Sequence, residues 1–242
     1  MATSSDAPVA LVTGCATGIG LSAVKLLVSR GYRVLMADWN YEKIAEESVA
    51  LGSNTFAVRC DVSDWESQVA AFDKAIELWG RVDVVGANAG LPEQVPLLFD
   101  TGDVPKKPTT IVVDVDLVGV IYSVNLALHH FRKHGSGRGG RIVITSSQVG
   151  IHAFPTGPIY GAAKAGRVPP HIITPMENHM KAWTEFIETD IYGYVYEVDA
   201  GGLYNRTAPE YWSPEHQSWL GAPETQEMWR KVGTLGAADV EK

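Results

Sequence analysis

The chain has 242 residues, of which 45% are hydrophobic and 20% are charged. These proportions suit a single compact α/β domain over residues 1–242 with a sizeable core. The formal net charge of −8 disfavours a nucleic acid or an anionic membrane as the partner. The first residues carry no basic, apolar leader, and no apolar run approaches the length that spans a bilayer. We therefore expect a cytoplasmic protein without a membrane partner.

Cysteine and histidine give no sign of a metal site. The two cysteines, Cys15 and Cys60, are too few for a disulfide framework or a metal cluster. The seven histidines show no metal-binding spacing. His129 and His130 are adjacent, so a helix would direct them to different sides, and we expect both to face solvent. The prediction is that no metal is bound.

Strand and helix patterns alternate through the first two thirds of the chain. Short, continuously apolar runs predict strands at 9–12, 33–37, 55–59, 82–86 and 141–145. Between them, helices are predicted at 18–29, 41–51, 64–79 and 110–133. Strands of this kind occur where helices cover both faces of a sheet. The pattern therefore predicts a three-layer, doubly wound, parallel α/β sheet of the Rossmann-like class.

A glycine-rich turn, Thr13-Gly-Cys-Ala-Thr-Gly-Ile-Gly20, joins the first predicted strand to the first predicted helix. This layout places backbone N–H groups and a helix N-terminus against a pyrophosphate. Glycine lets the backbone approach the ligand where a Cβ would clash. The turn thus indicates a dinucleotide bound by Gly14, Thr17, Gly18, Ile19 and Gly20. Many such turns also occur with no ligand, so the motif alone does not decide.

Polar residues follow the next three predicted strands. Asp38 could accept hydrogen bonds from a ribose diol and would repel a 2′-phosphate, which favours NAD over NADP. Alternatively it is a turn residue before a helix that Asn40 caps. Asp61 could meet the adenine or cap the next helix. The run Asn88-Ala89-Gly90 lies at the carboxyl edge of the sheet, where ligands bind in such folds.

Tyr160 and Lys164 are four residues apart, so on a helix they share one face. An ammonium beside a phenol favours the phenolate and lowers its pKa from about 10. Such a phenol can move a proton to or from a carbinol oxygen while a hydride travels to nicotinamide. Ser147, just past the fifth predicted strand, could hold the substrate oxygen. A Tyr-x-x-x-Lys pair alone is usually an exposed helix pair, and its weight here comes from following Ser147 in this order.

Together these features resemble the short-chain dehydrogenase/reductase family over roughly residues 8 to 165. The matching motifs are Thr13-Gly-x-x-x-Gly-Ile-Gly20, Asp38, Cys60-Asp61-Val62, Asn88-Ala-Gly90, Ser147 and Tyr160-x-x-x-Lys164. The resemblance implies NAD-dependent interconversion of an alcohol and a ketone or aldehyde. Tyr160 would be the acid/base, Lys164 would bind the nicotinamide ribose and tune Tyr160, and Ser147 would orient the substrate oxygen. By the same resemblance the cofactor site would include Asp61 at the adenine, with Val62, Asn88, Ala89 and Gly90.

The chain departs from the family pattern at Asp116, which we also place in the catalytic set. The family usually has Asn-Leu-x-Gly here, whereas this chain has Asp116-Leu-Val-Gly119. An amide both donates and accepts hydrogen bonds, but a carboxylate only accepts. We expect Asp116 to stabilise the Lys164 ammonium and to impair a proton relay past this helix.

A βα segment is also missing after Lys164. The family continues with a long helix, a sixth strand and a substrate-covering loop, but Pro169, Pro170 and Pro175 forbid a continuous helix here. Too few residues remain for a crossover helix and a strand. We expect the helix of Tyr160 and Lys164 to stop within about a turn of Lys164 and the sixth strand to be absent or shortened, with 167–173 as its only candidate remnant. Beyond the gap the chain resembles the family's late helix at 177–188 and final strand at 193–198.

Two functions are consistent with these residues. The first is a short-chain oxidoreductase acting on a small-molecule alcohol or carbonyl, with activity that the missing segment would impair. The alternative is a catalytically inactive protein of the same fold that binds NAD or another protein. The missing helix commonly forms the family's subunit interface, so a homo-oligomer is possible but not firmly expected. Residues 203–242 form an aromatic-rich extension that could cover the substrate or a subunit interface, or simply pack on the domain.

Overall fold

The computed structural model describes most of the first two thirds of the chain. The described residues are 7–93, 104–105, 107–134, 140–150 and 157–165, six residues between 180 and 188, and the backbone of 195–199 and 202–206. By its internal contacts the chain divides into two units, Met1–Tyr204 and Asn205–Lys242. The predicted extension, residues 203–242, lies outside the described part except at the end of one short strand.

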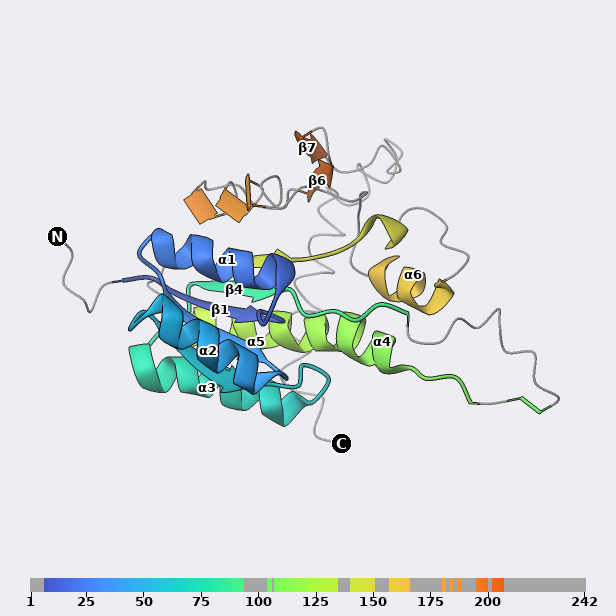
Figure 1. Ribbon diagram of the computed structural model, residues 1–242, viewed down its shortest axis with the longest axis horizontal. Coiled ribbons are helices and arrows are strands. Elements are labelled where there is room, and N and C mark those ends of the chain that lie inside the picture. The colour runs from blue at the N-terminus through green and yellow to red at the C-terminus, as the bar shows by residue number, and fades with distance from the viewer. Residues whose placement is uncertain are drawn as a thin grey trace, which may run out of the picture. The chain divides into compact units, whose positions relative to one another are not determined.

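A five-stranded parallel sheet forms the centre of the fold (Figure 1). Its strands are β1 (Val9–Thr13), β2 (Arg33–Asp38), β3 (Thr55–Arg59), β4 (Val84–Ala87) and β5 (Arg141–Ile144). Their order is β3-β2-β1-β4-β5, so the chain starts in the middle and builds outward first to one side and then to the other. Each neighbouring pair is parallel, with Val12 of β1 opposite Met36 of β2 and Gly86 of β4. The predicted doubly wound α/β fold is confirmed.

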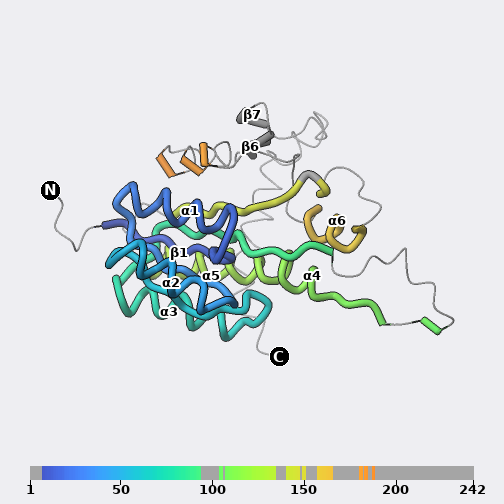
Figure 2. Tube along the Cα trace, in the orientation of Figure 1, coloured from blue at the N-terminus to red at the C-terminus, as the bar shows by residue number. Residues whose placement is uncertain are grey.

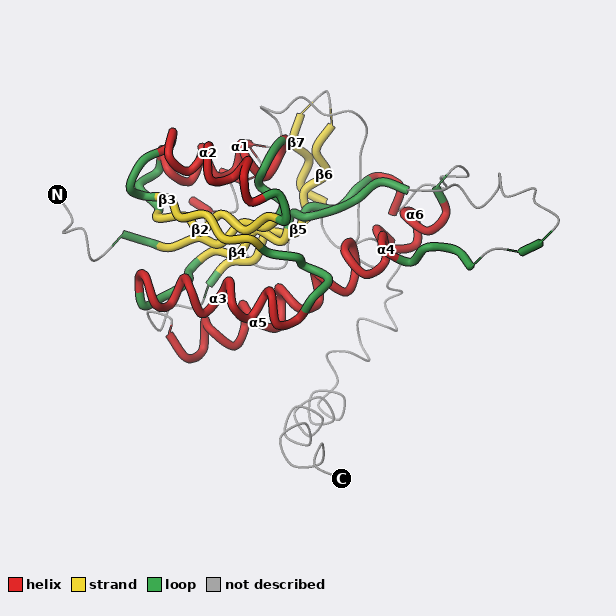
Figure 3. The backbone as a smooth tube through the Cα atoms, turned by 60° about the horizontal axis from the view of Figure 1, so that its bottom comes forward, coloured by secondary structure: helices red, strands yellow, loops and turns green. Residues whose placement is uncertain are grey.

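Helices cover both faces of this sheet. They are α1 (Gly18–Ser29), α2 (Tyr41–Leu51), α3 (Trp65–Trp79), α4 (Ile111–Val113), the π-helical segment η2 (Asp114–Val118) and α5 (Gly119–His134). Figure 3 shows α1 and α2 on one face of the sheet and α3 and α5 on the other. Because side chains alternate along a strand, Val12 belongs to the first core and its neighbour Leu11 to the second. Both faces are buried, which explains the continuously apolar strands.

One helical path is longer and more apolar than we expected. Figure 2 shows α4, η2 and α5 following one another along this path. Among the described residues, Ile111–His134 is the one helix that could cross a membrane by length and composition, with 24 residues and a hydropathy of 1.9. This finding contradicts the expectation that no apolar run is long enough, because the surrounding Val, Ile and Leu residues keep the mean hydropathy high despite Asp114 and Asp116. Leu126 and Phe131 are buried in the core of the second face, as in a core helix.

The described part of the predicted late helix, 177–188, is confirmed. Its six described residues, Met180, Lys181, Trp183, Thr184, Ile187 and Glu188, are all helical. Trp183 is only 3% exposed and packs so closely on β4 that a Cβ on Gly86 would lie 2.5 Å from its ring. At the end of α1, Arg30 pairs with Glu188 at 2.7 Å between Nε and Oε1. This helix therefore completes the core on the face that α1 covers.

The final strand predicted at 193–198 forms, but outside the main sheet. β6 (Val195–Asp199) pairs with β7 (Gly202–Arg206) in a sheet of two strands. Only two residues, 200 and 201, separate the two strands in sequence. β6 therefore pairs with the strand that follows it in sequence, β7, and not with the five-stranded sheet. The candidate remnant of the sixth strand, 167–173, lies outside the described residues.

His130 is buried, contrary to the expectation that it faces solvent. It is 6% exposed, and its ring stacks on Phe72 of α3 with centroids 5.3 Å apart and 20° between the planes. The reason is its helix position, because His130 lies on the same side of α5 as Leu126 and Ala127, which face the core. Burial first, and the charges of His129 and His134 next, lower the pKa of His130.

We expect acid to destabilise the fold through His130. Because its pKa is lowered in the folded state, the unfolded chain binds more protons below the ordinary histidine pKa of about 6.5. This contribution to stability is therefore present above about pH 6.5 and is lost as the pH falls. His130→Phe should reduce the loss of unfolding free energy between about pH 7.5 and pH 5, measured by urea unfolding. The exposed His129→Phe should keep most of the loss, and equal pH dependence in all three proteins would contradict the assignment.

Candidate active site

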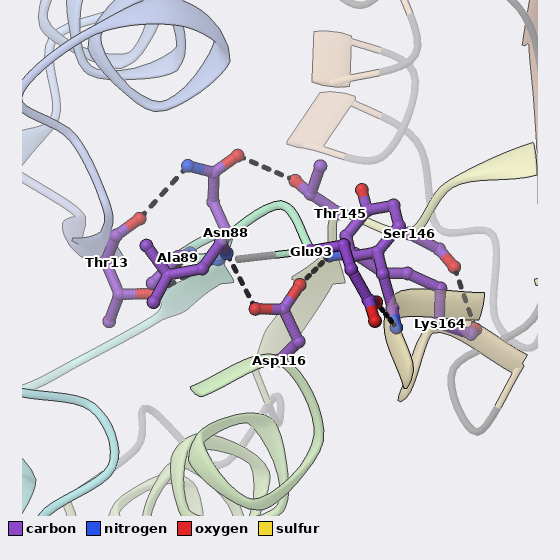
Figure 4. Close-up of polar contacts among 10 residues, drawn as sticks. Thr13, Asn88, Ala89, Glu93, Asp116, Thr145, Ser146 and Lys164 are labelled. Carbon is purple, nitrogen blue, oxygen red and sulfur yellow. Dashed lines mark hydrogen bonds and ion pairs between the residues drawn. The ribbon is translucent and has the colours of Figure 1, made fainter. Parts of the chain in front are cut away.

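The loops after β1 and β4 meet at the point where the strand order reverses, which is where such sheets bind ligands. The Asn88 side chain joins them, because its Nδ2 donates to the carbonyl oxygens of Thr13 at 3.2 Å and Gly14 at 2.9 Å. Its Oδ1 accepts the Thr145 hydroxyl at 2.8 Å, which adds the end of β5 (Figure 4). The Thr13 hydroxyl in turn accepts the N–H groups of Asn88 and Ala89 at 3.1 and 3.2 Å. Asn88 therefore holds the glycine turn to the loop after β4.

The glycine turn has the shape that a pyrophosphate site needs. Gly14 has a φ of +64°, and a Cβ there would lie 2.5 Å from the Cα of Ala89. A Cβ on Gly20 would lie 2.6 Å from Asn88 Nδ2 and would also strike the Gly14 carbonyl oxygen. Thr17 makes no side-chain cap at the start of α1, and the first turn of this helix holds no acidic residue. The N–H groups of that turn, beside the exposed Thr17 and Gly18 and the half-buried Ile19, therefore suit an anion.

Gly14→Ala should weaken NADH binding far more than a matched glycine substitution. The new methyl group would meet the Ala89 backbone and displace the turn from its place against the ligand. Gly31→Ala is the control, because Gly31 also has a positive φ, +81°, but no atom within 4 Å of the added Cβ. Fluorescence titration with NADH and thermal unfolding would be measured for both. Similar losses of affinity in the two variants would show that backbone strain, not crowding of the turn, is responsible.

Asp38 lies at the end of β2 and is 6% exposed. Its Oδ2 accepts the Ala16 N–H and its Oδ1 the Asn40 N–H, each at 2.9 Å. Asn40 itself caps α2, because its Oδ1 accepts the Lys43 N–H at 3.2 Å. The carboxylate thus holds the glycine turn in place, and each oxygen keeps a lone pair that could accept from a ribose hydroxyl.

Asp61 and Val62 begin the loop between β3 and α3. Asp61 is exposed, and its Oδ1 accepts the N–H and the hydroxyl of Ser63 at 2.9 and 2.6 Å, which stabilises the turn before α3. Val62 packs on the backbone of Gly119, where a Cβ would lie 2.9 Å from the Val62 carbonyl oxygen. The buried Gln68 fastens this contact by donating from Nε2 to the carbonyls of Val62 at 2.7 Å and Gly119 at 2.8 Å. The loop is thereby tied to the end of η2.

Tyr160 and Lys164 lie on α6 (Pro158–Ala165), and the residues that would test its predicted end, from 166 on, lie outside the described part of the chain. The Lys164 ammonium lies 5.3 Å from the centroid of the Tyr160 ring. Its Nζ also lies 2.7 Å from Oδ2 of Asp116, with 4% of the lysine side chain and none of the aspartate side chain exposed (Figure 4). Three of the predicted catalytic residues are therefore in one cluster, in which Asp116 and Lys164 form a buried ion pair and Tyr160 is half-buried.

Two features bring Asp116 to this position. It lies in the π-helical segment η2, a type of distortion that recurs at functional sites. Its Oδ1 accepts the Leu91 N–H at 2.7 Å, which fixes the carboxylate to the loop after β4. Gly90, the residue before Leu91, leaves space for the ion pair. A Cβ at this position would lie 2.9 Å from Asp116 Oδ2 and 3.0 Å from Lys164 Nζ. The predicted site residue Gly90 thus packs on the ion pair.

Ser147 follows β5 and directly precedes the short 3₁₀ turn η3 (Gln148–Gly150). Its carbonyl accepts the Gly150 N–H at 3.1 Å, which closes the turn. Gly150 packs on α6, since a Cβ there would lie 2.6 Å from the carbonyl oxygen of Lys164. The neighbouring Ser146 hydroxyl donates to the same carbonyl oxygen at 3.4 Å. Ser147 and α6 are therefore held at the same edge of the sheet.

Glu93, on the loop after β4, is a contact of this cluster that the sequence did not reveal. Its Oε2 accepts the backbone N–H of Tyr160 at 2.6 Å. A glutamate three residues after Gly90 belongs to no motif, and no sequence pattern joins it to Tyr160, which lies 67 positions later. Only the folded loop shows the contact.

Both cysteines behave as buried apolar residues. Cys15 is 0% exposed and Cys60 2% exposed. Burial raises the pKa of the Cys15 thiol far above its ordinary value, and it raises the pKa of the Cys60 thiol to about 11. Both thiols therefore stay protonated at neutral pH and react poorly. Among the residues that the structure describes, no group of three or more metal-ligating side chains is assembled.

Known proteins show the same arrangement of motifs. The model of the short chain dehydrogenase family matches residues 8–169, a span that contains every predicted site residue. The chain belongs to the short-chain dehydrogenase/reductase family. This is consistent with the sheet order and with the cluster of Tyr160, Lys164 and Asp116 at its carboxyl edge.

Individual members of the family are moderately similar. The short-chain dehydrogenase/reductase prx4 of Penicillium roqueforti is 34% identical over 166 residues, which are 67% of this chain and 47% of that protein. Human 15-hydroxyprostaglandin dehydrogenase [NAD(+)] is 32% identical over 165 residues, 66% of this chain and 58% of that enzyme. An alcohol dehydrogenase of Thermococcus sibiricus, solved with 5-hydroxy-NADP, has a TM-score of 0.58 and 27% identity, covering 66% of this chain and 67% of that one. The chain thus spans about half the length of the first of these relatives.

Proposed function

We propose that this short-chain oxidoreductase interconverts a small-molecule alcohol and the corresponding ketone or aldehyde, with NAD as the cofactor. The observation that carries the proposal is the pair on α6, in which the buried Lys164 ammonium lies 5.3 Å from the centroid of the half-buried Tyr160 ring. It lies at the same edge of the sheet as the glycine turn. A phenol beside a cation, next to a dinucleotide site, suits proton transfer coupled to hydride transfer.

The residues of the glycine turn fit the dinucleotide. The uncapped first turn of α1, from Gly18 to Gly20, would hold the pyrophosphate, and Asp38 would accept from a ribose hydroxyl. The dinucleotide held there would supply hydride transfer to or from the carbinol carbon. A carboxylate at Asp38 would repel a 2′-phosphate, which favours NAD. The names of the similar proteins include both NAD(+) and an NADP analogue, so Asp38 is the basis of this preference.

The chain's own residues would handle the proton. In oxidation, Tyr160 as phenolate accepts the proton of the substrate hydroxyl, and in reduction the phenol returns it. Ser147 orients the same oxygen, and Lys164 keeps a positive charge beside the Tyr160 ring. Asp116 holds that ammonium at 2.7 Å and partly offsets its charge. We therefore propose that proton transfer works best at a higher pH than it would with an asparagine at this position.

A titration combined with a turnover screen tests the proposed function. NADH and NADPH fluorescence titrations would give the cofactor preference, and absorbance at the nicotinamide band would follow turnover of a panel of secondary alcohols, ketones and aldehydes. The proposal expects tighter binding of NADH than of NADPH and turnover of at least one substrate class. Binding without turnover would favour the catalytically inactive alternative. No binding of either cofactor to well-folded protein would overturn the dinucleotide site itself.

A further inference from the structure

Helix α6 carries two of the catalytic candidates, and its N-terminal end is described from Gly157 onward. Its first N–H groups have no acceptor within the helix. The Gly161 N–H reaches the carbonyl of Gly157 at 2.9 Å, so Tyr160 is the last residue whose N–H needs an acceptor from elsewhere.

Glu93 supplies that acceptor. Its Oε2 lies 2.6 Å from the Tyr160 nitrogen, a length typical of a hydrogen bond to a charged acceptor. A carboxylate at a helix N-terminus also interacts favourably with the helix dipole. The contact joins the loop after β4 to α6, and Figure 4 shows Glu93 beside Lys164 and Asp116.

The second carboxylate oxygen of Glu93 is in an energetically unfavourable position. Oε1 is buried without a hydrogen-bond partner among the described residues. An exposed glutamate would turn such an oxygen toward water, so a buried one calls for a local reason. The adjoining loop contacts give that reason, because the Leu91 N–H binds Asp116 and Gly90 packs on Lys164. The loop from Gly90 to Glu93 thus touches the cluster at three points.

The two ends of α6 are held by different loops. At the C-terminal end, the Ser146 hydroxyl and the closely packed Gly150 contact the carbonyl of Lys164. At the N-terminal end, the Glu93 side chain accepts the backbone N–H of Tyr160. Loss of the Glu93 carboxylate would therefore loosen the turn that bears Tyr160 while leaving Lys164 on Asp116.

We propose that Glu93 is a positioning residue for Tyr160, acting through the Tyr160 backbone N–H. The proposal rests on the proposed function in so far as Tyr160 is the acid/base. Glu93→Ala should lower kcat by roughly 10- to 100-fold, since small displacements of a reacting group are costly. It should leave NADH affinity nearly unchanged, because the hydrogen bond of Glu93 is to α6 and the pyrophosphate would lie at the start of α1. Glu93→Gln should restore most of kcat, because its amide oxygen can accept the same hydrogen bond.

Amide hydrogen exchange tests the contact without any turnover. We expect the Tyr160 amide to exchange on the order of tenfold faster in Glu93→Ala and near the wild-type rate in Glu93→Gln. Glu66→Ala is the matched control, because Glu66 is an exposed acidic residue in the first turn of another helix, α3. It should change neither the exchange of Tyr160 nor kcat.

The outcomes separate this inference from the proposed function. If wild-type protein turns over no substrate, the proposed function fails, and faster Tyr160 exchange in Glu93→Ala alone still supports the contact. Unchanged Tyr160 exchange in Glu93→Ala overturns the inference. If Glu93→Ala is too unstable to measure, Glu93→Gln decides, because wild-type exchange and near wild-type kcat support the inference. Rapid Tyr160 exchange in folded Glu93→Gln overturns it.

Discussion

Tyr160→Phe is expected to lower kcat by roughly two to four decades while NADH binding stays nearly intact. The substitution removes the hydroxyl that would carry the proton and keeps the ring on which the Lys164 ammonium lies, 5.3 Å from its centroid. It also keeps the backbone N–H that Glu93 accepts. The loss should therefore appear in turnover and not in cofactor affinity, measured by steady-state kinetics and by fluorescence titration.

Tyr122→Phe is the matched control for this experiment. Tyr122 lies on α5, and its ring packs edge-on against Trp65 with centroids 5.3 Å apart. It should retain wild-type turnover. Loss of NADH binding in Tyr160→Phe would count against the acid/base role, because it would show that Tyr160 holds the cofactor or the fold. Full turnover in Tyr160→Phe would exclude Tyr160 as the proton carrier.

The sheet and its helices could be predicted from the sequence because each element has a local signal. The central strand β1 is buried on both faces, and it is apolar from Val9 to Val12. The helices Gly18–Ser29 and Tyr41–Leu51 have the boundaries that their glycine and Asn40 signals predict. The order of the strands then brings the predicted site residues to one edge. This is why motifs far apart in sequence could be combined into one candidate site.

The contacts inside the site could not be predicted, because they depend on distances that no local pattern encodes. The sequence suggested that Asp116 would stabilise the Lys164 ammonium, but not that the pair would be fully buried at 2.7 Å. As a polar residue in a predicted helix, Gln68 would be expected on the surface. Nothing in the sequence indicates that it joins Val62 to Gly119. His130 was misjudged for a related reason, since adjacent histidines identify no buried side until the helix packs on α3.

Lys164→Met is expected to destabilise the fold by about 3–5 kcal/mol, the usual result of removing one partner of a buried ion pair. The Asp116 side chain is fully buried, so its carboxylate would lose its cation without gaining water. Lys43→Met is the control, because Lys43 pairs with Glu46 and Glu47 at 3.4 and 3.3 Å on the surface. Solvent screens that pair, and little change in unfolding free energy is expected. Urea unfolding near pH 7 would compare the two variants.

A second substitution tests whether the unpaired Asp116 carboxylate causes the loss of stability. Lys164→Met combined with Asp116→Asn should recover most of the lost stability, since a neutral amide can keep the Leu91 N–H bond without a buried charge. A Lys164→Met variant no less stable than Lys43→Met would contradict a buried ion pair at this site. Full recovery in the double variant without recovery of turnover would show that the pair stabilises the fold and that catalysis needs the ammonium itself.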